Sequence, residues 1–319
     1  MLRFKDSLGL AARPNDVLAV GEMLVDFIAE EYEEEATRES AYRPYFGGAP
    51  ANLAMNAQKL GARAKVAAAV GRDRLGDYLI GRLEAAAMST ELVERVRKAT
   101  SMVLLTKSQN SPVPIFYRSA DHRLSLTPQL AQAVRDSAVL HLSCWPLSRQ
   151  PSRGTIEAAM RIAAEQGVLI GFDPNYHPAL WPEDEDGVAY VRWMIGQADV
   201  IKPSDDDAER LFGKDTPDNQ LAKFIALGAK LVILTLGREG AIASDGRETL
   251  RFPSLATEVA DTTGAGDAFW SGFYTSLIQG DTVETAIRLG FAVSAYKLRS
   301  IGAVVDLPRL DKIRQMYGL

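Results

Sequence analysis

The amino-acid sequence predicts an α/β fold in which helices cover both faces of a mostly parallel β-sheet, with a small second sheet beside it. Short apolar runs rich in β-branched residues recur along the 319 residues, and helical segments separate them. Strands that alternate with helices in this way favour a parallel sheet. Two pairs of strand-like segments break the alternation and predict the small sheet.

The first predicted strand is 17–21 (VLAVG), a buried run that ends on glycine. The other strands of the predicted main sheet are 65–70, 139–143, 168–172, 200–202 and 231–236. The small sheet is predicted from 24–30 and 40–46, which flank an acidic turn, and from 101–107 and 113–119, which flank 109–112 as a hairpin would. We find no internal repeat and no interdomain linker, so we expect one domain over 1–319.

The composition restricts the partners and the compartment. A formal charge of −5, without a basic patch, argues against binding to a nucleic acid. A single cysteine, Cys144, excludes an intramolecular disulfide and fits a reducing compartment. No segment approaches the roughly 18 apolar residues of a membrane span or the pattern of a signal peptide. We therefore expect a cytoplasmic protein that does not bind membranes.

The most informative segment is 261–267 (DTTGAGD), which precedes a helical pattern. Gly264 and Gly266 let backbone N–H groups converge at a helix N-terminus, where the helix dipole favours an anion. Asp267, just beyond this turn, suits a base that accepts a proton from an attacking hydroxyl. The alternative is a plain strand-to-helix turn with Asp267 exposed. Phe269 stands where a dinucleotide motif needs its third glycine, and the chain has no P-loop sequence.

A second glycine pair lies near the amino terminus, in 47–52 (GGAPAN), and opens another predicted helix. Pro50 suits a first helical turn and Gly61 suits a helix C-terminus. Asn52 both donates and accepts hydrogen bonds, as the hydroxyls of a polyol require. Taken alone, this segment fits an ordinary capped helix equally well.

Together the two segments carry a resemblance to a known family. The run 47–54 (GGAPANLA), with Gly61 and Gly71 following, resembles the amino-terminal signature of the ribokinase-like carbohydrate kinases, the phosphofructokinase B family. The run 261–267, with 271–273 (SGF), resembles the carboxy-terminal signature. The resemblance covers about residues 17–308. It implies a three-layer α/β/α domain of the ribokinase-like fold, with a β-sheet lid formed by about 24–46 and 101–119.

The resemblance also implies an ATP-dependent and Mg²⁺-dependent sugar kinase with assigned residues. Asp267 is then the catalytic base, and the anion hole comprises the amides of Gly264, Ala265 and Gly266. The sugar-binding positions are Asp26, Gly48 and Asn52. The nucleotide-side positions are Thr235, Gly237 and Gly240. A homodimer that pairs through the lid is expected.

The resemblance also implies two ion sites, one for Mg²⁺ and one for a monovalent cation beside the anion hole. The family's Asn-x-x-Glu motif, which organises Mg²⁺, falls on 204–207 (SDDD), so that Asp207 stands where the glutamate is expected. Asp261 and Thr263 match positions that hold a monovalent cation such as K⁺ in many relatives. Hard oxygen ligands suit such an ion.

Within the family, GGAPAN, the FYR of 116–118 and the DPN of 173–175 are typical of fructokinases. The predicted reaction is therefore phosphorylation of D-fructose to fructose 6-phosphate. Ribose, 2-keto-3-deoxygluconate, 5-dehydro-2-deoxygluconate and a nucleoside remain alternative substrates. A sugar-responsive binding protein without catalysis is the alternative from another class, and an NAD-binding oxidoreductase is a distant third.

Overall fold

The computed structural model describes residues 2–32, 41–107 and 114–319. In this part of the chain a nine-stranded sheet runs in the order β13-β12-β11-β10-β9-β8-β1-β4-β5. Its strands from β5 to β11 are parallel, and β12 and β13 add an antiparallel edge. The strand bounds are β1 Asn15–Val20, β4 Ala64–Gly71, β5 Val93–Val96, β8 Ser137–Ser143, β9 Leu169–Asp173, β10 Val200–Ile201, β11 Leu231–Thr235, β12 Ala241–Ser244 and β13 Thr249–Phe252.

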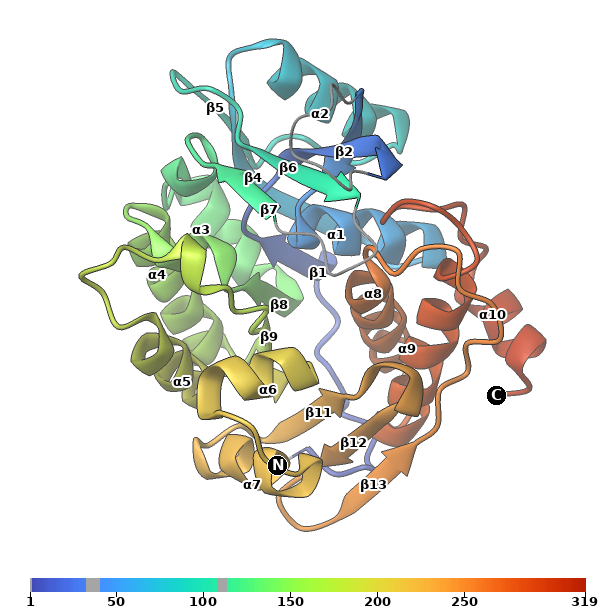
Figure 1. Cartoon of the computed structure of the whole chain (residues 1–319). Coiled ribbons are helices and arrows are strands. Elements are labelled where there is room, and N and C mark those ends of the chain that lie inside the picture. Colours follow the sequence, from blue (N-terminus) through green and yellow to red (C-terminus); the bar gives the residue numbers. More distant parts are fainter. Residues whose placement is uncertain (1, 33–40, 108–113) are drawn as a thin grey trace.

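The helices form a layer on each face of this sheet (Figure 1). Alternate strand residues point to opposite faces, so Val17 and Ala19 join one core and Leu18 and Val20 join the other. The first core is covered by α1 Ala49–Leu60, α2 Arg74–Ala85, α8 Ala265–Ile278 and α9 Val283–Lys297. The second is covered by α3 Pro128–Arg135, α4 Ser152–Gln166, α5 Gly187–Gln197, α6 Asp205–Phe212 and α7 Pro217–Ala226. The last helix, α10 Leu310–Tyr317, packs on α8 and α9.

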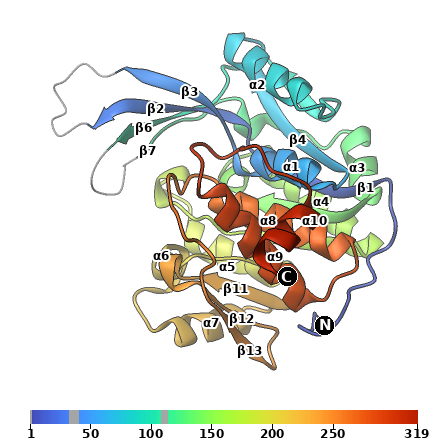
Figure 2. The same ribbon diagram turned by 90° about the vertical axis from the view of Figure 1, so that its right-hand side faces the viewer.

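The small sheet has the order β3-β2-β6-β7 and projects from the main body (Figure 2). Its strands are β2 Leu24–Tyr32, β3 Tyr42–Gly47, β6 Met102–Lys107 and β7 Pro114–Tyr117. Asp26 lies opposite Tyr45 on β3 and Val103 on β6, and Val103 lies opposite Phe116. Residues opposite one another share a face, so Asp26 and Phe116 are on the same side of the small sheet.

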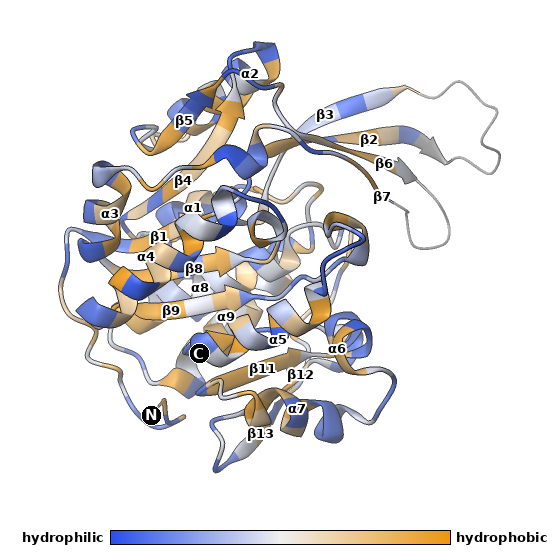
Figure 3. Cartoon of the chain, turned by 90° about the vertical axis from the view of Figure 1, so that its left-hand side faces the viewer, coloured by the Kyte–Doolittle hydropathy of each residue, from blue (hydrophilic) through white to orange (hydrophobic). Residues whose placement is uncertain are grey.

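The predicted fold class is confirmed, with three strands that the sequence analysis missed. The predicted strands of the main sheet are all present, with ends that differ by a few residues. The missed strands, β5, β12 and β13, are edge or near-edge strands of four residues each, and β5 (VERV) is half polar. Figure 3 shows the contrast with the apolar central strands. The turns expected near 33–40 and 108–113 lie outside the described residues.

Across the described ranges, no helix is long and apolar enough to cross a membrane.

Candidate active site

The candidate site lies where the parallel strands of the main sheet end. Glu22 follows β1, Ser143 ends β8, Asp173 ends β9, Lys202 follows β10 and Thr235 ends β11. The carboxyl ends of parallel strands share one edge of a sheet, which is where ligands bind in open α/β folds. The helices α1 and α8 begin at this edge, and they bring both glycine-rich segments of the sequence together there.

The segment 261–267 forms the N-terminus of α8, as predicted. Gly264 has a left-handed φ of 74°, and a Cβ there would lie 2.5 Å from the Cβ of Ala303, so only glycine fits. The Ala265 N–H donates to the Thr262 carbonyl at 3.1 Å. The N–H groups of Gly266 and Asp267 have no protein acceptor among the described residues, which leaves them open to an anion at the positive end of the helix dipole.

The segment 47–52 packs against the chain just after β1. Gly48 has a φ of 106°, and a Cβ there would meet the Glu22 carbonyl oxygen at 2.4 Å. The Glu22 carboxylate accepts from the Ala49 N–H at 3.0 Å and from the Ser143 hydroxyl at 2.6 Å. Glu22 therefore fixes the start of α1 against the sheet. The sequence analysis gave it no role, although a carboxylate directly after a buried strand was a usable signal.

Asn52 and Asp267 meet at the centre of the site, although 215 positions separate them. The Asn52 Nδ2 atom donates to Asp267 Oδ2 at 3.0 Å. Asn52 is only 5% exposed, and its Oδ1 atom has no protein partner among the described residues. A buried acceptor without a partner is costly, so this oxygen is placed to accept a hydrogen bond from a ligand hydroxyl.

Carboxyl groups gather at this point, and burial perturbs each of them. Asp26 lies over Gly47, where a Cβ would meet its Oδ2 atom at 2.3 Å. Burial, reinforced by the charge of Asp267, raises the pKa of Asp26 and that of Glu22 to about 7. Burial and the nearby Asp173 raise the pKa of Asp267 to about 7 as well. A carboxylate with a pKa near the working pH suits general base catalysis.

A buried lysine that the sequence analysis missed lies beside the anion hole. A Cβ on Gly266 would lie 3.1 Å from the Lys202 Nζ atom. Lys202 also pairs with Asp173 Oδ2 at 3.2 Å, and the same oxygen accepts from the Trp270 indole N–H at 2.8 Å. This network holds the ammonium group where it would face an anion bound at the α8 N-terminus. Its only sequence signal is a lysine directly after a short buried strand.

The predicted nucleotide-side loop lies next to the segment that follows Lys202. Thr235 N–H donates to the Pro203 carbonyl at 2.9 Å, which ties β11 to the segment after β10. Gly237 has a φ of 54°, and a Cβ there would meet nothing within 4 Å, so a ligand can approach the backbone. Gly240 differs, because a Cβ there would lie 2.0 Å from the Phe252 carbonyl oxygen. Gly240 thus serves packing of the β12 hairpin.

Asp207 is buried and engaged with the protein. It forms a capping box with Ser204 at the start of α6, and its other oxygen accepts from the Tyr176 N–H at 2.7 Å. Within the described ranges, no group of three or more His, Cys, Asp or Glu residues could hold a metal ion. Asp207 therefore joins the segment after β9 to the start of α6.

Asp261 and Thr263 lie side by side before α8. Asp261 Oδ1 accepts from the Thr263 N–H at 2.9 Å and from its hydroxyl at 2.8 Å, and Oδ2 accepts from the Gly302 N–H at 2.7 Å. Burial opposes ionisation of Asp261, but these hydrogen bonds and Lys297 hold its pKa below the ordinary value. The Lys297 Nζ atom donates to the Asp261 carbonyl at 2.8 Å.

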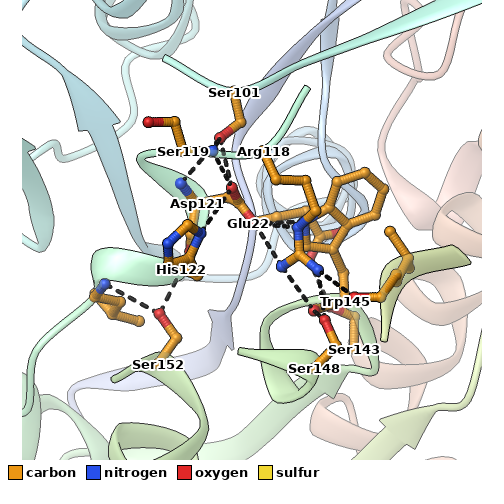
Figure 4. A network of polar contacts seen from close by, with 12 residues as sticks. Glu22, Ser101, Arg118, Ser119, Asp121, His122, Ser143, Trp145, Ser148 and Ser152 are labelled. Carbon is orange, nitrogen blue, oxygen red and sulfur yellow. Dashed lines mark hydrogen bonds and ion pairs between the residues drawn. The ribbon is translucent and has the colours of Figure 1, made fainter. Parts of the chain in front are cut away.

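A polar network anchors the small sheet to the main body (Figure 4). Arg118, directly after β7, donates twice to Asp121 and also to the Ser148 hydroxyl and to the carbonyls of Leu180 and Trp145. These bonds use all five N–H donors of a guanidinium group. The arginine of the FYR segment therefore has a structural role. The ring of Phe116 beside it packs edge-on against the rings of Trp145 and His177, with 5.1 Å between ring centroids in each pair.

Comparisons with known proteins agree on one family. Residues 14–310 match the model of the pfkB family carbohydrate kinases. The chain is 51% identical over 319 residues to an ATP-dependent 6-phosphofructokinase of Thermoanaerobacterium thermosaccharolyticum, covering 100% of this chain and 99% of that protein. The structure of Halothermothrix orenii fructokinase is similar with a TM-score of 0.79 and 41% identity, covering 86% of this chain and 97% of that one. The Vibrio cholerae O395 fructokinase with fructose, ADP and calcium ion bound has a TM-score of 0.80 and 26% identity, covering 94% and 98%.

Proposed function

This chain belongs to the pfkB family of carbohydrate kinases, and we propose that it transfers the γ-phosphoryl group of ATP to D-fructose, giving fructose 6-phosphate. The observation that carries the proposal is the contact between Asn52 and Asp267 at the open N-terminus of α8. The Asn52 Nδ2 atom donates to Asp267, the proposed base, and the Asn52 Oδ1 atom is a buried acceptor without a protein partner among the described residues. That arrangement suits a hydroxyl bound beside a base and an anion hole.

In the proposed reaction, Asp26 and Asn52 Oδ1 accept hydrogen bonds from the sugar and align its reacting hydroxyl. Asp267 takes the hydroxyl proton as the oxygen attacks the γ-phosphorus, and ADP leaves from the opposite side. The amides of Gly266 and Asp267, with the Lys202 ammonium, stabilise the charge on the phosphoryl oxygens. Gly264 shapes the turn. The Ala265 amide is directed at Thr262, so we assign the expected role of Ala265 to the Asp267 amide.

Mg²⁺ enters this proposal with ATP, as part of the substrate. Mg²⁺ keeps several waters and is commonly held by phosphate oxygens with few protein ligands. In the described part of the chain, no group of three or more His, Cys, Asp or Glu residues could hold a metal ion, which is compatible with that mode. Asp207 would then act by holding the segments on either side of Lys202. Thr235 and Gly237 would border the nucleotide, with Gly240 fixing their loop.

A substrate panel tests the assignment to fructose. With Mg²⁺ and ATP saturating, we expect kcat/KM for D-fructose to exceed that for D-ribose, 2-keto-3-deoxygluconate, 5-dehydro-2-deoxygluconate and adenosine by at least roughly tenfold, or about 1.4 kcal/mol. A higher kcat/KM with another compound would change the assigned substrate but not the assignment as a kinase. No ADP formation with any of these compounds or with fructose 6-phosphate would support a sugar-responsive binding protein.

Fructose 6-phosphate is the second candidate, because the relative that is 51% identical over the full chain is named a 6-phosphofructokinase. A bound phosphate ester needs a cation, and Arg118 has no free donor. Arg43 lies opposite Ile28, on the face of the small sheet that carries Asp26. Its side chain is exposed, and its surface ion pair with Glu30 can be exchanged for one with a sugar phosphate. Arg43→Gln should then abolish use of fructose 6-phosphate and spare that of fructose. Equal losses of kcat/KM with both sugars would show that Arg43 does not recognise the phosphate.

We also propose that the small sheet acts as a lid and pairs between two subunits. Ile115 and Tyr117, on the side of β7 away from Asp26, are 46% and 50% exposed, which favours an apolar contact. Light scattering should detect a dimer at micromolar concentration, and Tyr117→Glu should produce a monomer. A wild-type monomer with full activity would overturn the pairing.

A further inference from the structure

Lys297 is a fully buried lysine next to the anion hole, and the proposed mechanism does not use it. It is the last residue of α9, and its exposed fraction is 0%. A charge in such a place requires close partners. Its Nζ atom donates to the Asp261 carbonyl at 2.8 Å and lies 3.9 Å from Asp261 Oδ2.

The Asp261 side chain joins the two segments that enclose Gly264. One oxygen binds Thr263, within the 261–267 segment, and the other binds the N–H of Gly302. Gly264 packs on Ala303, the residue after Gly302. The Leu298 carbonyl, one residue past Lys297, accepts from the Ala260 N–H at 2.7 Å. The end of α9 and the 302–303 segment thus hold the turn that aims the Gly266 and Asp267 amides.

These contacts do not fit a monovalent metal ion bound by Asp261 and Thr263. Such an ion needs several oxygens with lone pairs to spare. Here the Asp261 carbonyl already accepts from an ammonium group, both carboxylate oxygens accept from protein donors, and the Thr263 hydroxyl points its proton at Asp261. A second cation would also be repelled by the Lys297 charge at close range.

We propose that Lys297 is the built-in cation of this site, so that the protein needs no K⁺ to organise its anion hole. Lys297 acts as a positioning residue: its ammonium group binds Asp261, and Asp261 holds the turn before α8. The charge of Lys297 also favours the ionised form of Asp267 and so lowers the pKa of that base. The catalytic part of this inference rests on the proposed kinase function, whereas the ion-binding part does not.

The test compares wild type, Lys297→Met and the control Lys59→Met in K⁺ and in tetramethylammonium at matched ionic strength. Lys59 also donates to a backbone carbonyl, that of Val305 at 2.6 Å, but it has no contact with Asp261. Both Tm and kcat are measured, because Tm reports ion binding even if no sugar is turned over. We expect wild-type Tm and kcat to be the same in both salts, within about twofold for kcat.

Lys297→Met should lose at least about tenfold in kcat in tetramethylammonium, and K⁺ should restore part of it and raise Tm. Lys59→Met should show no response to K⁺. A wild-type enzyme that K⁺ activates severalfold or stabilises would overturn the proposal, as would a Lys297→Met variant with full kcat in tetramethylammonium. If that variant does not fold, the wild-type comparison decides alone. A wild type that turns over no sugar contradicts the kinase proposal only, and its Tm still tests the ion claim.

Discussion

Replacement of Asp26 by asparagine should separate the cost of burying this carboxylate from its use in binding sugar. The side chain lies over Gly47 on the small sheet, and burial together with Asp267 raises its pKa from 3.8 to about 7. At pH values between 3.8 and about 7, Asp26 is therefore protonated in the folded protein and ionised in the unfolded chain. Stability contributed by this group is present at low pH and falls as the pH rises to about 7.

The size of the effect follows from that pKa difference. A pKa difference of about three corresponds to about 4 kcal/mol. We expect about 1 to 3 kcal/mol, because the Asp26 side chain keeps some contact with solvent, which screens the charge. Asparagine cannot ionise, so Asp26→Asn should be more stable than wild type at pH values above about 7 by this amount, and the gain should vanish near pH 4.

Urea unfolding monitored by fluorescence across this pH range measures the difference, with Glu30→Gln as the control. Glu30 lies on the same strand but is exposed and paired with Arg43, so its variant should change stability by less than about 1 kcal/mol. In kinase assays, Asp26→Asn should reduce kcat/KM for the sugar at least about tenfold and leave ATP binding unchanged. A stability difference that does not depend on pH would refute the burial argument, and a normal kcat/KM would refute the sugar contact.

Two further variants test other parts of the site. Lys202→Met should lower kcat on the order of 10²-fold, about 3 kcal/mol, because it removes a cation beside the Gly266 amide; measured by steady-state kinetics, an unchanged kcat would exclude that contact. Gly237→Ala should weaken ATP binding in calorimetry if the nucleotide covers that backbone, and its positive φ should cost about 1 kcal/mol of stability. Gly240→Ala should destabilise the fold more, because its Cβ would also meet the Phe252 carbonyl. Normal ATP binding by Gly237→Ala would show that the nucleotide does not cover the Gly237 backbone.

Local sequence patterns predicted the fold well where each strand is buried on both faces. Runs such as VLAVG contain little besides apolar residues, because a central parallel strand meets helices on both sides. The edge strands β5 and β13 carry no such run, since one edge or face meets solvent. Strand β12 (AIAS) is buried, but its four residues are too short a run to stand out. Their positions depend on pairing with neighbours, which periodicity does not reveal.

The candidate site was predictable where a motif carries the chemistry by itself. Gly264, Gly266 and Asp267 are adjacent in sequence, so their turn could be recognised directly. Lys202 and Lys297 reach the same point from the ends of β10 and α9, and neither has a local pattern that distinguishes it from a surface lysine. Only the tertiary structure brings buried charges from distant segments to one site.

The most direct test of the proposed chemistry is the rate of phosphoryl transfer in Asp267→Asn, measured by rapid quench with ATP and fructose bound. We expect a loss on the order of 10²- to 10⁴-fold, roughly 3 to 5 kcal/mol, with nearly unchanged affinity for both ligands. The control Asp218→Asn, whose exposed side chain on α7 pairs with Arg251, should behave as wild type. The wild-type rate should also fall below a pH of about 7, as Asp267 becomes protonated, and this fall should be absent in Asp267→Asn. A variant that binds both ligands and transfers the phosphoryl group at the wild-type rate would contradict the assignment of Asp267 as the base.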